Sequence, residues 1–331
     1  MWAVVHTRYG QPDVLQVGSV AVPAPAAGEV LVEVAAAAVN PLDWHFTTGR
    51  PYFLRLMFGL RRPKQATRGA DVAGRVVALG DGVTELAIGD RVAGVAAGSF
   101  AEFATAKASS LAVVPGGLAD HEAAALPLAG VTALQALRDQ GAVSAGQHVL
   151  VVGAAGGVGV YAVQLAVAMG AVVTGVCSGR NADLVRSLGA ADVVDYETAD
   201  WVGGTRYDLI IDCVGSRPLG ACRRALVDGG RYVMIGGPKS NPWLDPLARV
   251  VAGKLRFAFR SQQFRQFTAV IKRDDVRELF DRVEAGELRA VVTRRVALDD
   301  VPVAIAAFAG GHARGKVVVD VRTLGESGET A

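Results

Sequence analysis

The chain has 331 residues, a formal net charge of +2, and a composition that is 51% hydrophobic but only 6% aromatic. This length allows one or two domains with a large aliphatic core, and the small net charge gives no indication of a nucleic-acid partner. The first residues, Met1 to His6, read as a strand rather than as a targeting segment, so we expect a cytoplasmic protein without a membrane span. The cysteines, Cys177, Cys213 and Cys222, are odd in number and not closely paired, which predicts reduced thiols.

Residues 1 to 122 are rich in short strands and turns. Strand patterns cover Val30–Val34, Val72–Leu79 and Ser99–Thr105, and glycine-rich turns separate them. This regular alternation predicts a compact unit that resembles a β-barrel. The segment Pro51–Lys64 mixes large apolar side chains with arginines. It is either an amphipathic loop or short helix covering the barrel, or a wall over a substrate cleft.

The stretch from His148 to Ser178 predicts one strand–helix–strand unit. Val149–Val152 suits a buried strand, a glycine-rich turn and an apolar helical stripe follow, and Val172–Cys177 reads as a second strand. The glycines let backbone approach a ligand closely, and the N-terminus of the new helix suits a pyrophosphate. Val149–Cys177 has no charged residue and could span a bilayer, but its six glycines and two strand patterns argue against one continuous helix.

Further strands are expected at Asp192–Asp195, Asp208–Cys213 and Arg231–Ile235. Their alternation with helical segments predicts an α/β fold with a doubly wound parallel sheet. Leu255–Arg260 is interpreted as a last strand, and Asp274–Glu284 as a helix with one apolar face.

Several motifs resemble the medium-chain dehydrogenase/reductase superfamily, specifically its zinc-independent quinone oxidoreductase and enone reductase branch. They are V-L-V-V-G-A-A-G-G-V-G-V-Y-A-V-Q-L-A (149–166), Asn40-Pro41-Leu42-Asp43, G-A-D-V-A-G-R-V-V-A-L-G (69–80), I-G-D-R-V-A-G (88–94) and H-A-R-G-K-V-V-V (312–319). The resemblance implies a GroES-like catalytic domain from residues 1–122 and 261–331, and a Rossmann nucleotide-binding domain from 123–260. It also implies a homodimer, with pairing through an edge strand.

The resemblance assigns residues to a nicotinamide cofactor. The threonine of A-G-x-T-A, here Thr132, and the loops that follow two strands would lie near the nicotinamide. The full set of cofactor residues outside the adenosine end is Asn40, Thr132, Ala155, Gly156, Gly157, Val158, Val214, Gly215, Ile235, Gly236, Gly237 and Lys316.

The tip of the second strand of the nucleotide domain indicates NADPH. NAD-binding relatives carry an acidic residue there, whereas this strand is followed by Ser178-Gly179-Arg180. A hydroxyl and a guanidinium would bind a 2′-phosphate, which a carboxylate would repel. Ser178 and Arg180 are the candidates, and family members place a tyrosine, here Tyr196, near the same phosphate.

No metal site is expected. Zinc alcohol dehydrogenases have a cysteine ligand and a G-H-E motif where this chain has Asn40-Pro41 and Arg68-Gly69-Ala70-Asp71. The lobe with four cysteines that binds structural zinc is also missing, and the five histidines lack ligand spacing. Without a metal to polarise a carbonyl, alcohol oxidation lacks its Lewis acid.

Hydride transfer to a quinone, or to the C=C bond of an enone or enal, is the favoured reaction. Asn40 is a candidate hydrogen-bond donor or nicotinamide positioner, and His45 and Tyr52 are candidate oxygen partners or proton donors. The family often has a tyrosine where His45 stands, so solvent or the cofactor ribose could supply the proton instead.

Two other classes stay open. One is a zinc alcohol dehydrogenase, which the missing ligands disfavour. The other is a non-catalytic NADPH-binding sensor or scaffold, which some relatives of this branch resemble in function. A short-chain dehydrogenase is disfavoured because the chain has no Y-x-x-x-K motif.

Overall fold

The computed structural model describes residues 1–237, 247–309 and 313–321. It divides into two compact units. The first contains Met1–Leu128, Ile271–Glu284 and Ala290–Ala331, and the second contains Ala129–Val270 and Ala285–Arg289. The sequence predicts domain boundaries near residues 122 and 261, and these boundaries stay a prediction. Of the motifs that carried the resemblance, only His312 of the motif 312–319 lies outside the described residues.

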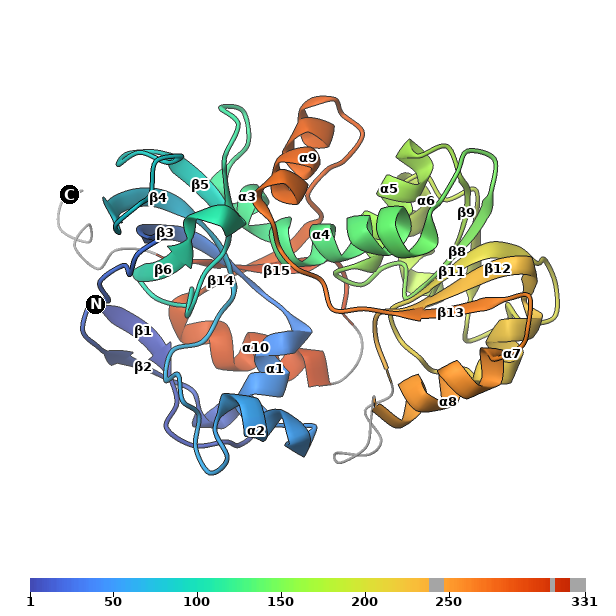
Figure 1. Cartoon of the computed structure of the whole chain (residues 1–331), viewed down its shortest axis with the longest axis horizontal. Helices are drawn as coiled ribbons and strands as arrows, with labels where there is room; N and C mark the ends of the chain where they lie inside the picture. The colour runs from blue at the N-terminus through green and yellow to red at the C-terminus, as the bar shows by residue number, and fades with distance from the viewer. Residues whose placement is uncertain (238–246, 310–312, 322–331) are drawn as a thin grey trace. The chain divides into compact units, whose positions relative to one another are not determined.

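The first unit is built on a seven-stranded sheet in the order β14-β15-β3-β4-β5-β7, with β6 paired to β3 (Figure 1). Neighbouring strands are antiparallel except β14 and β15, which run parallel. Within the described residues no strand pair joins β14 to β7, so the barrel expected from the sequence is not shown. The strands are β3 (Glu29–Val39), β4 (Asp71–Leu79), β5 (Arg91–Val95), β6 (Phe103–Lys107), β7 (Leu111–Val113), β14 (Val292–Ala297) and β15 (Lys316–Asp320).

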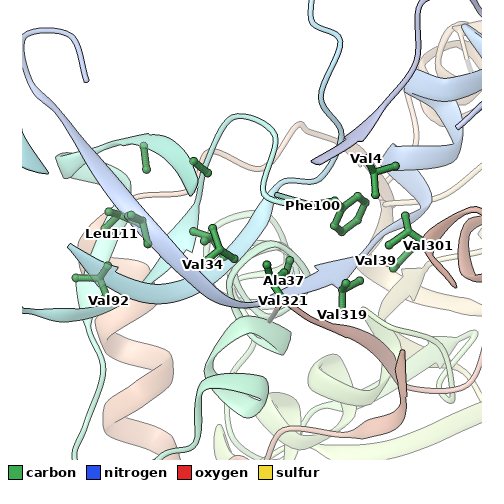
Figure 2. Packing of buried hydrophobic residues seen from close by; sticks show 14 of the residues in the cluster. Val4, Val34, Ala37, Val39, Val92, Phe100, Leu111, Val301, Val319 and Val321 are labelled. Carbon is green, nitrogen blue, oxygen red and sulfur yellow. The ribbon is translucent and has the colours of Figure 1, made fainter. Parts of the chain in front are cut away.

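Strand β3 is the centre of this unit, because it pairs with β4, β6 and β15. Most of its side chains are buried, including a run of alanines whose small size lets other elements approach closely. Figure 2 shows Val34, Ala37 and Val39 of β3 packed with apolar side chains of neighbouring elements. One of these neighbours is Phe100, and another is Val301 of α10 (Val301–Ala309). Full burial of each valine or phenylalanine side chain stabilises the fold by about 1.5–3 kcal/mol.

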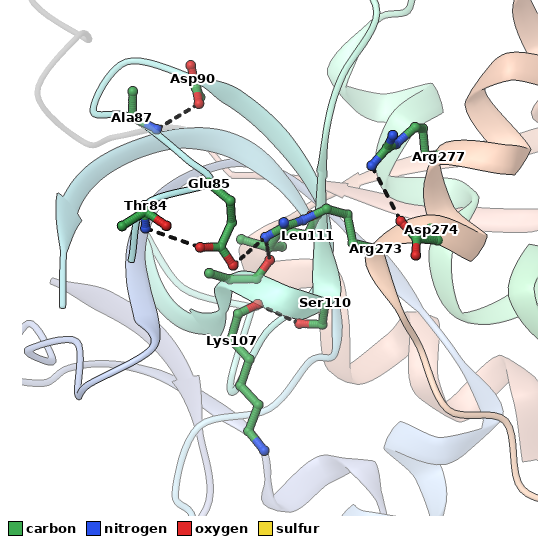
Figure 3. Close-up of polar contacts among 11 residues, drawn as sticks. Thr84, Glu85, Ala87, Asp90, Lys107, Ser110, Leu111, Arg273, Asp274 and Arg277 are labelled. Atoms are coloured by element: carbon green, nitrogen blue, oxygen red, sulfur yellow. Dashed lines mark hydrogen bonds and ion pairs between the residues drawn. The ribbon is translucent and has the colours of Figure 1, made fainter. Parts of the chain in front are cut away.

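The chain returns to the first unit through α9 (Arg273–Glu284), whose first residue is tied to the β-strands (Figure 3). The Arg273 guanidinium donates hydrogen bonds to the carbonyl oxygens of Leu111 (2.9 Å) and Ala108 (2.5 Å). It also pairs with Glu85 at 3.0 Å. One arginine therefore holds residues that lie more than 160 positions earlier in the chain.

The second unit has a six-stranded parallel sheet in the order β10-β9-β8-β11-β12-β13. Renumbered from its first strand, this order is 3-2-1-4-5-6, which is the dinucleotide-binding Rossmann order. Its strands are β8 (His148–Val152), β9 (Val172–Cys177), β10 (Asp192–Asp195), β11 (Tyr207–Asp212), β12 (Leu226–Met234) and β13 (Gln263–Gln266). Its helices include α5 (Gly159–Ala168), α6 (Ala182–Ser187), α7 (Leu219–Arg224) and α8 (Leu247–Phe257).

The strand–helix–strand unit expected at 148–178 is confirmed as β8, α5 and β9. The uncharged stretch Val149–Cys177 is therefore two strands and a helix. Among the helices that the structure describes, none is long and apolar enough to cross a bilayer.

The last strand was placed wrongly by the sequence. Leu255–Arg260 was expected to form it, but Leu255 belongs to α8 and the strand follows as β13. The apolar residues Leu247, Val251 and Leu255 recur every fourth position, which is helical spacing. They are exposed, and the buried side of α8 is formed by Gly253 and Phe257.

Candidate active site

The first unit contains a buried polar cluster centred on Asp71, the first residue of β4. This carboxylate is fully buried and accepts three hydrogen bonds. The donors are the backbone N–H of Leu128 (2.8 Å), the side-chain amide of Asn40 (2.9 Å) and the ammonium of Lys316 (3.1 Å). Leu128 lies in the first turn of α4 (Pro127–Gln135), where helix N–H groups lack an internal acceptor and a negative charge is favourable.

Asn40 follows β3 and caps α1 (Pro41–Thr48). Its Nδ2 donates to the Ala38 carbonyl at 3.1 Å and to Asp71, and its Oδ1 accepts from Lys316 at 2.6 Å. A lysine only donates and a carboxylate only accepts, so the network fixes which way the amide points. Both amide hydrogens are used within the protein, so Asn40 offers a ligand only its carbonyl oxygen.

Lys316, the first residue of β15, is 2% exposed and lies between Asn40 and Asp71. The fold thus brings together two predicted cofactor residues that are 276 positions apart in the chain. In this arrangement the Lys316 ammonium orients the Asn40 amide.

Asp43 stabilises the N-terminus of α1. Its carboxylate accepts a hydrogen bond from the backbone N–H of Asn40 at 2.8 Å, which completes a capping box. Burial raises the pKa of Asp43 from 3.8 to about 7, and nearby Asp71 adds to the rise. The hydrogen bond from Asn40 acts in the opposite direction.

His45 lies on α1, with its Nδ1 2.8 Å from the carbonyl oxygen of Arg50. A carbonyl oxygen can only accept, so Nδ1 carries a hydrogen. In the neutral ring Nε2 is then an acceptor. His45 could donate a proton from Nε2 only as the cation.

Tyr52 begins the short turn η2 (Tyr52–Leu54) and lies near Arg55 of α2 (Arg55–Phe58). The Arg55 guanidinium lies 4.6 Å from the ring centroid of Tyr52 and 4.5 Å from that of Tyr9. It also donates to the carbonyl oxygens of Thr48 and Gly49 at the end of α1. One arginine therefore fixes both tyrosine rings relative to α1.

A cavity of about 230 Å³ lies within the first unit. Phe58, Pro63 and Lys64 form part of its wall, and the same segment contains the short helices η2 and α2, so both expectations for Pro51–Lys64 stay predictions. The lining residues are Tyr9, Phe46, Phe58, Pro63, Lys64, Gln65, Thr67, Arg68, Gly69, Ala70, Ala96, Ala97 and Gly98. His45 and Tyr52 are not among them.

The described residues of this unit do not offer a donor set that fits a zinc ion. At the positions where the sequence comparison expected zinc ligands, the side chains are Asn40 and Ala70. Across residues 1–237, 247–309 and 313–321 there is no group of three or more His, Cys, Asp or Glu side chains that could hold a metal. Tetrahedral zinc needs at least three such ligands.

The second unit carries the glycine turn between β8 and α5. Gly153 has φ +81°, and a Cβ on Gly159 would lie 2.1 Å from the Gly153 carbonyl oxygen. The helix therefore packs so closely on the turn that position 159 must be glycine. The N–H groups of Gly157 and Val158 donate to no backbone carbonyl in the described chain. Those free donors and the α5 dipole fit a pyrophosphate.

The tip of β9 is less positive than the sequence suggested. Ser178 is buried and accepts a hydrogen bond from Asn181 at 3.1 Å, while Arg180 is exposed. Tyr196 is 45% exposed beside this tip, with its backbone N–H bonded to Cys177. However, Asp195 of β10 also lies there, because a Cβ on Gly179 would be 2.6 Å from its Oδ2. A carboxylate absent from the β9 sequence is supplied by the neighbouring strand.

A second turn follows β11 and is fixed by Asp212. One oxygen of this buried carboxylate accepts from the N–H groups of Val214 (2.9 Å) and Gly215 (2.7 Å). The other accepts from the Tyr232 hydroxyl at 2.5 Å, which in turn accepts from Arg249 of α8 at 3.0 Å. A Cβ on Gly236 would lie 2.0 Å from the Cys213 carbonyl oxygen, so the turns after β11 and β12 are in direct backbone contact. These turns hold five of the predicted cofactor residues, Val214, Gly215, Ile235, Gly236 and Gly237.

Other predicted cofactor residues have ordinary surroundings. Thr132 is half-buried on α4, and Ala155 is buried within the glycine turn.

Sequence reasoning missed Asp71, Asp212 and Arg68 as members of these sites. Asp71 stood inside a quoted motif and Asp212 inside an expected strand, but no spacing rule indicated which donors they would meet.

We predict that Lys316→Met lowers the free energy of unfolding by about 3–5 kcal/mol, because it leaves the Asp71 carboxylate buried without its cation. The measurement is urea unfolding. The double variant Lys316→Met, Asp71→Asn removes both charges and should be more stable than Lys316→Met alone. A loss below about 1 kcal/mol in the single variant would contradict the buried ion pair.

We predict that Asp43→Asn gains stability over the wild type as pH rises from about 4 to 7. The folded protein holds the Asp43 proton to a higher pH than the unfolded chain, so wild-type Asp43 contributes stability below its unfolded pKa of 3.8 that is lost as pH approaches 7. His6 acts oppositely, since burial lowers its pKa to about 4, but it is common to both proteins and cancels in the difference. Thermal unfolding at several pH values measures this difference, and a pH-independent difference would refute the prediction.

Known families and proteins match the chain over both units. The family "Alcohol dehydrogenase GroES-like domain" matches residues 26–116, and the family "Zinc-binding dehydrogenase" matches residues 188–319. The chloroplast envelope quinone oxidoreductase homolog of Arabidopsis thaliana is 32% identical over 337 residues, covering 97% of this chain and 98% of the relative. The trans-enoyl reductase pgmF of Aspergillus terreus is 31% identical, covering 88% of this chain and 86% of the relative.

A solved mycobacterial protein in complex with NADPH has the same fold. It superposes with a TM-score of 0.81 at 29% identity, covering 96% of this chain and 99% of the other. The same family is indicated by the glycine turn, by the Rossmann strand order and by the relatives that match nearly the whole chain. The chain therefore belongs to the quinone oxidoreductase branch of the medium-chain dehydrogenase/reductase superfamily, a branch of NAD(P)H-dependent oxidoreductases.

Proposed function

We propose that the protein is an NADPH-dependent, zinc-independent reductase that transfers hydride to a quinone or to the C=C bond of an enone or enal. The observation that carries this proposal is the glycine turn before α5, with its free N–H groups, in a chain whose other unit has no zinc donor set among its described residues. Relatives named as quinone oxidoreductase and trans-enoyl reductase support both acceptor classes.

When bound, the reduced nicotinamide supplies the hydride. The protein must first hold the nicotinamide ring and the acceptor next to each other in the orientation that hydride transfer requires. Asn40 is the proposed nicotinamide positioner, and its remaining role is that of an acceptor, because Ala38 and Asp71 take its amide hydrogens. Lys316 acts in this proposal as a positioning residue for Asn40 rather than as a direct cofactor ligand.

The second task is to manage charge and protons at the acceptor. Reduction of an enone places negative charge on its carbonyl oxygen, which a hydrogen-bond donor stabilises. Tyr52 and the cationic form of His45 are the proposed donors, since the neutral ring of His45 has its hydrogen on Nδ1 toward Arg50. Solvent is the alternative source of the proton.

We also propose that the protein is located in the cytoplasm and forms a homodimer. The relative from Arabidopsis thaliana is named for the chloroplast envelope, so the compartment differs within the branch. The three cysteines are free thiols in the structure, in keeping with a reducing compartment.

The proposal is tested by following the absorbance of NADPH with a panel of quinones, enals and enones, with and without a chelator. We expect turnover that the chelator does not change and that yields a hydroquinone or a saturated ketone. Tight NADPH binding without turnover of any acceptor would indicate a sensor instead. Loss of activity with the chelator would indicate an alcohol dehydrogenase type of site.

We predict that Arg180→Ala raises the KM for NADPH by roughly 10-fold or more, the size of one charged hydrogen bond, and leaves the KM for NADH nearly unchanged. The matched variant Asp195→Asn removes the carboxylate beside Gly179 and should lower the KM for NADPH. Steady-state kinetics with both cofactors measure this. Equal effects of Arg180→Ala on the two cofactors would show that Arg180 does not contact the 2′-phosphate.

A further inference from the structure

The cavity of the first unit has an unusual charge. Its lining contains the cations Lys64 and Arg68 and no carboxylate. Lys64 is exposed, whereas Arg68 is only 7% exposed. The remaining wall includes the apolar side chains of Phe46, Phe58 and Pro63. A small acceptor would therefore meet apolar walls and one buried positive charge.

Arg68 is buried without a full set of partners. Its Nη2 donates to the Gln65 carbonyl oxygen, while its Nε has no hydrogen-bond acceptor. Among the described residues no carboxylate lies within ion-pair distance of it. The Phe46 ring is a weaker partner, with its centroid 5.7 Å from the guanidinium carbon. Burying a cation in this state is costly, and an anion in the cavity would offset that cost.

The charges around Arg68 do not cancel it. Burial lowers the pKa of Arg68 to about 10, so the group is still a cation at neutral pH. The carboxylate that acts on it most is Asp43, which accepts its hydrogen bond from Asn40 and has a pKa near 7. The pKa of His6 is lowered to about 4, so this neighbour is neutral and adds no charge.

The backbone fixes where Arg68 lies. Its N–H donates to Val4 at 3.2 Å, and its carbonyl accepts from Phe100 at 2.8 Å. The next residue, Gly69, has φ +100°, and a Cβ there would lie 2.5 Å from the Ser99 hydroxyl. The backbone is therefore held on both sides of the Arg68 side chain.

We propose that Arg68 makes this cavity a carboxylate subsite, so that the preferred acceptor carries a carboxylate next to its reducible double bond or quinone ring. The Arg68 guanidinium offers a carboxylate a positive charge and the N–H donors that Gln65 does not take. The cavity volume of about 230 Å³ suits a small acceptor, since drug-sized ligands occupy roughly 300–1,000 Å³. This inference rests on the proposed reductase function and names its substrate class.

The simplest acceptor of this kind is acetylacrylate, an enone that bears a carboxylate. NADPH delivers a hydride to one alkene carbon, and a proton from solvent or a side chain adds to the other. The C=C bond becomes a single bond, NADPH becomes NADP⁺, and the product is levulinate. Methyl acetylacrylate is the matched neutral acceptor. An ester activates the alkene more than a carboxylate does, so a preference for the acid must come from binding.

The test measures kcat/KM for acetylacrylate and for its methyl ester. We expect the wild type to prefer the acid by roughly 10-fold to 100-fold, the size of a charged hydrogen-bonded contact. Arg68→Gln should bring this ratio close to one, mainly through the KM of the acid. Arg61→Gln makes the same change of charge at an exposed arginine outside the cavity lining, and it should keep the wild-type ratio.

Failure of this inference is distinguishable from failure of the proposed function. Equal kcat/KM for acid and ester in the wild type overturns the carboxylate subsite and leaves the reductase intact. If neither acceptor turns over and no quinone, enal or enone of the panel does, the proposed function fails, and binding then decides the subsite. In that case levulinate, but not methyl levulinate, should raise the Tm of the wild type in a manner that Arg68→Gln abolishes. Equal shifts from both compounds, or none, overturn it even if Arg68→Gln itself folds poorly.

Discussion

The first unit depends on one buried carboxylate. Asp71, at the start of β4, accepts hydrogen bonds from three distant places. They are the N-terminus of α4, the residue Asn40 that caps α1, and Lys316, the first residue of β15. These places are far apart in the chain, and a carboxylate without its donors would be costly in the interior. The same interaction leaves Asn40 with a fixed orientation and no spare amide hydrogen. Structural stability and the geometry of the candidate site therefore rest on the same atoms.

The second unit fixes its turns with close backbone contacts as well as with a buried carboxylate. Close approach of α5 to its turn requires glycine, and the turn then presents free N–H groups. The turn after β11 is held by Asp212, which Tyr232 and Arg249 support from behind. Both devices shape the carboxyl ends of parallel strands, where ligands bind in sheets of this order. The chemistry of the cofactor needs little more from this unit than a rigid and correctly spaced set of turns.

Local patterns predicted the second unit well because its strands are short, apolar and bounded by glycine. The βαβ unit at 148–178 is confirmed, and Asp192–Asp195 is a strand as expected. The prediction of a strand at Leu255–Arg260 is wrong because its apolar residues begin on the exposed face of helix α8. The helical spacing of these residues indicates a helix, whereas their apolar character alone suggested a buried strand. Contacts between distant residues could not be predicted. The meeting of Lys316 with Asn40, the approach of Asp195 to Gly179 and the isolation of Arg68 all depend on tertiary packing.

The central claim is direct hydride transfer to carbon without metal assistance. It is tested most directly with NADPH that carries deuterium at the transferred position of C4, an enone acceptor and mass spectrometry of the product. The account predicts a saturated ketone with one deuterium bonded to the carbon that was β to the carbonyl. An alcohol with deuterium on the former carbonyl carbon, or a product without label, would contradict it.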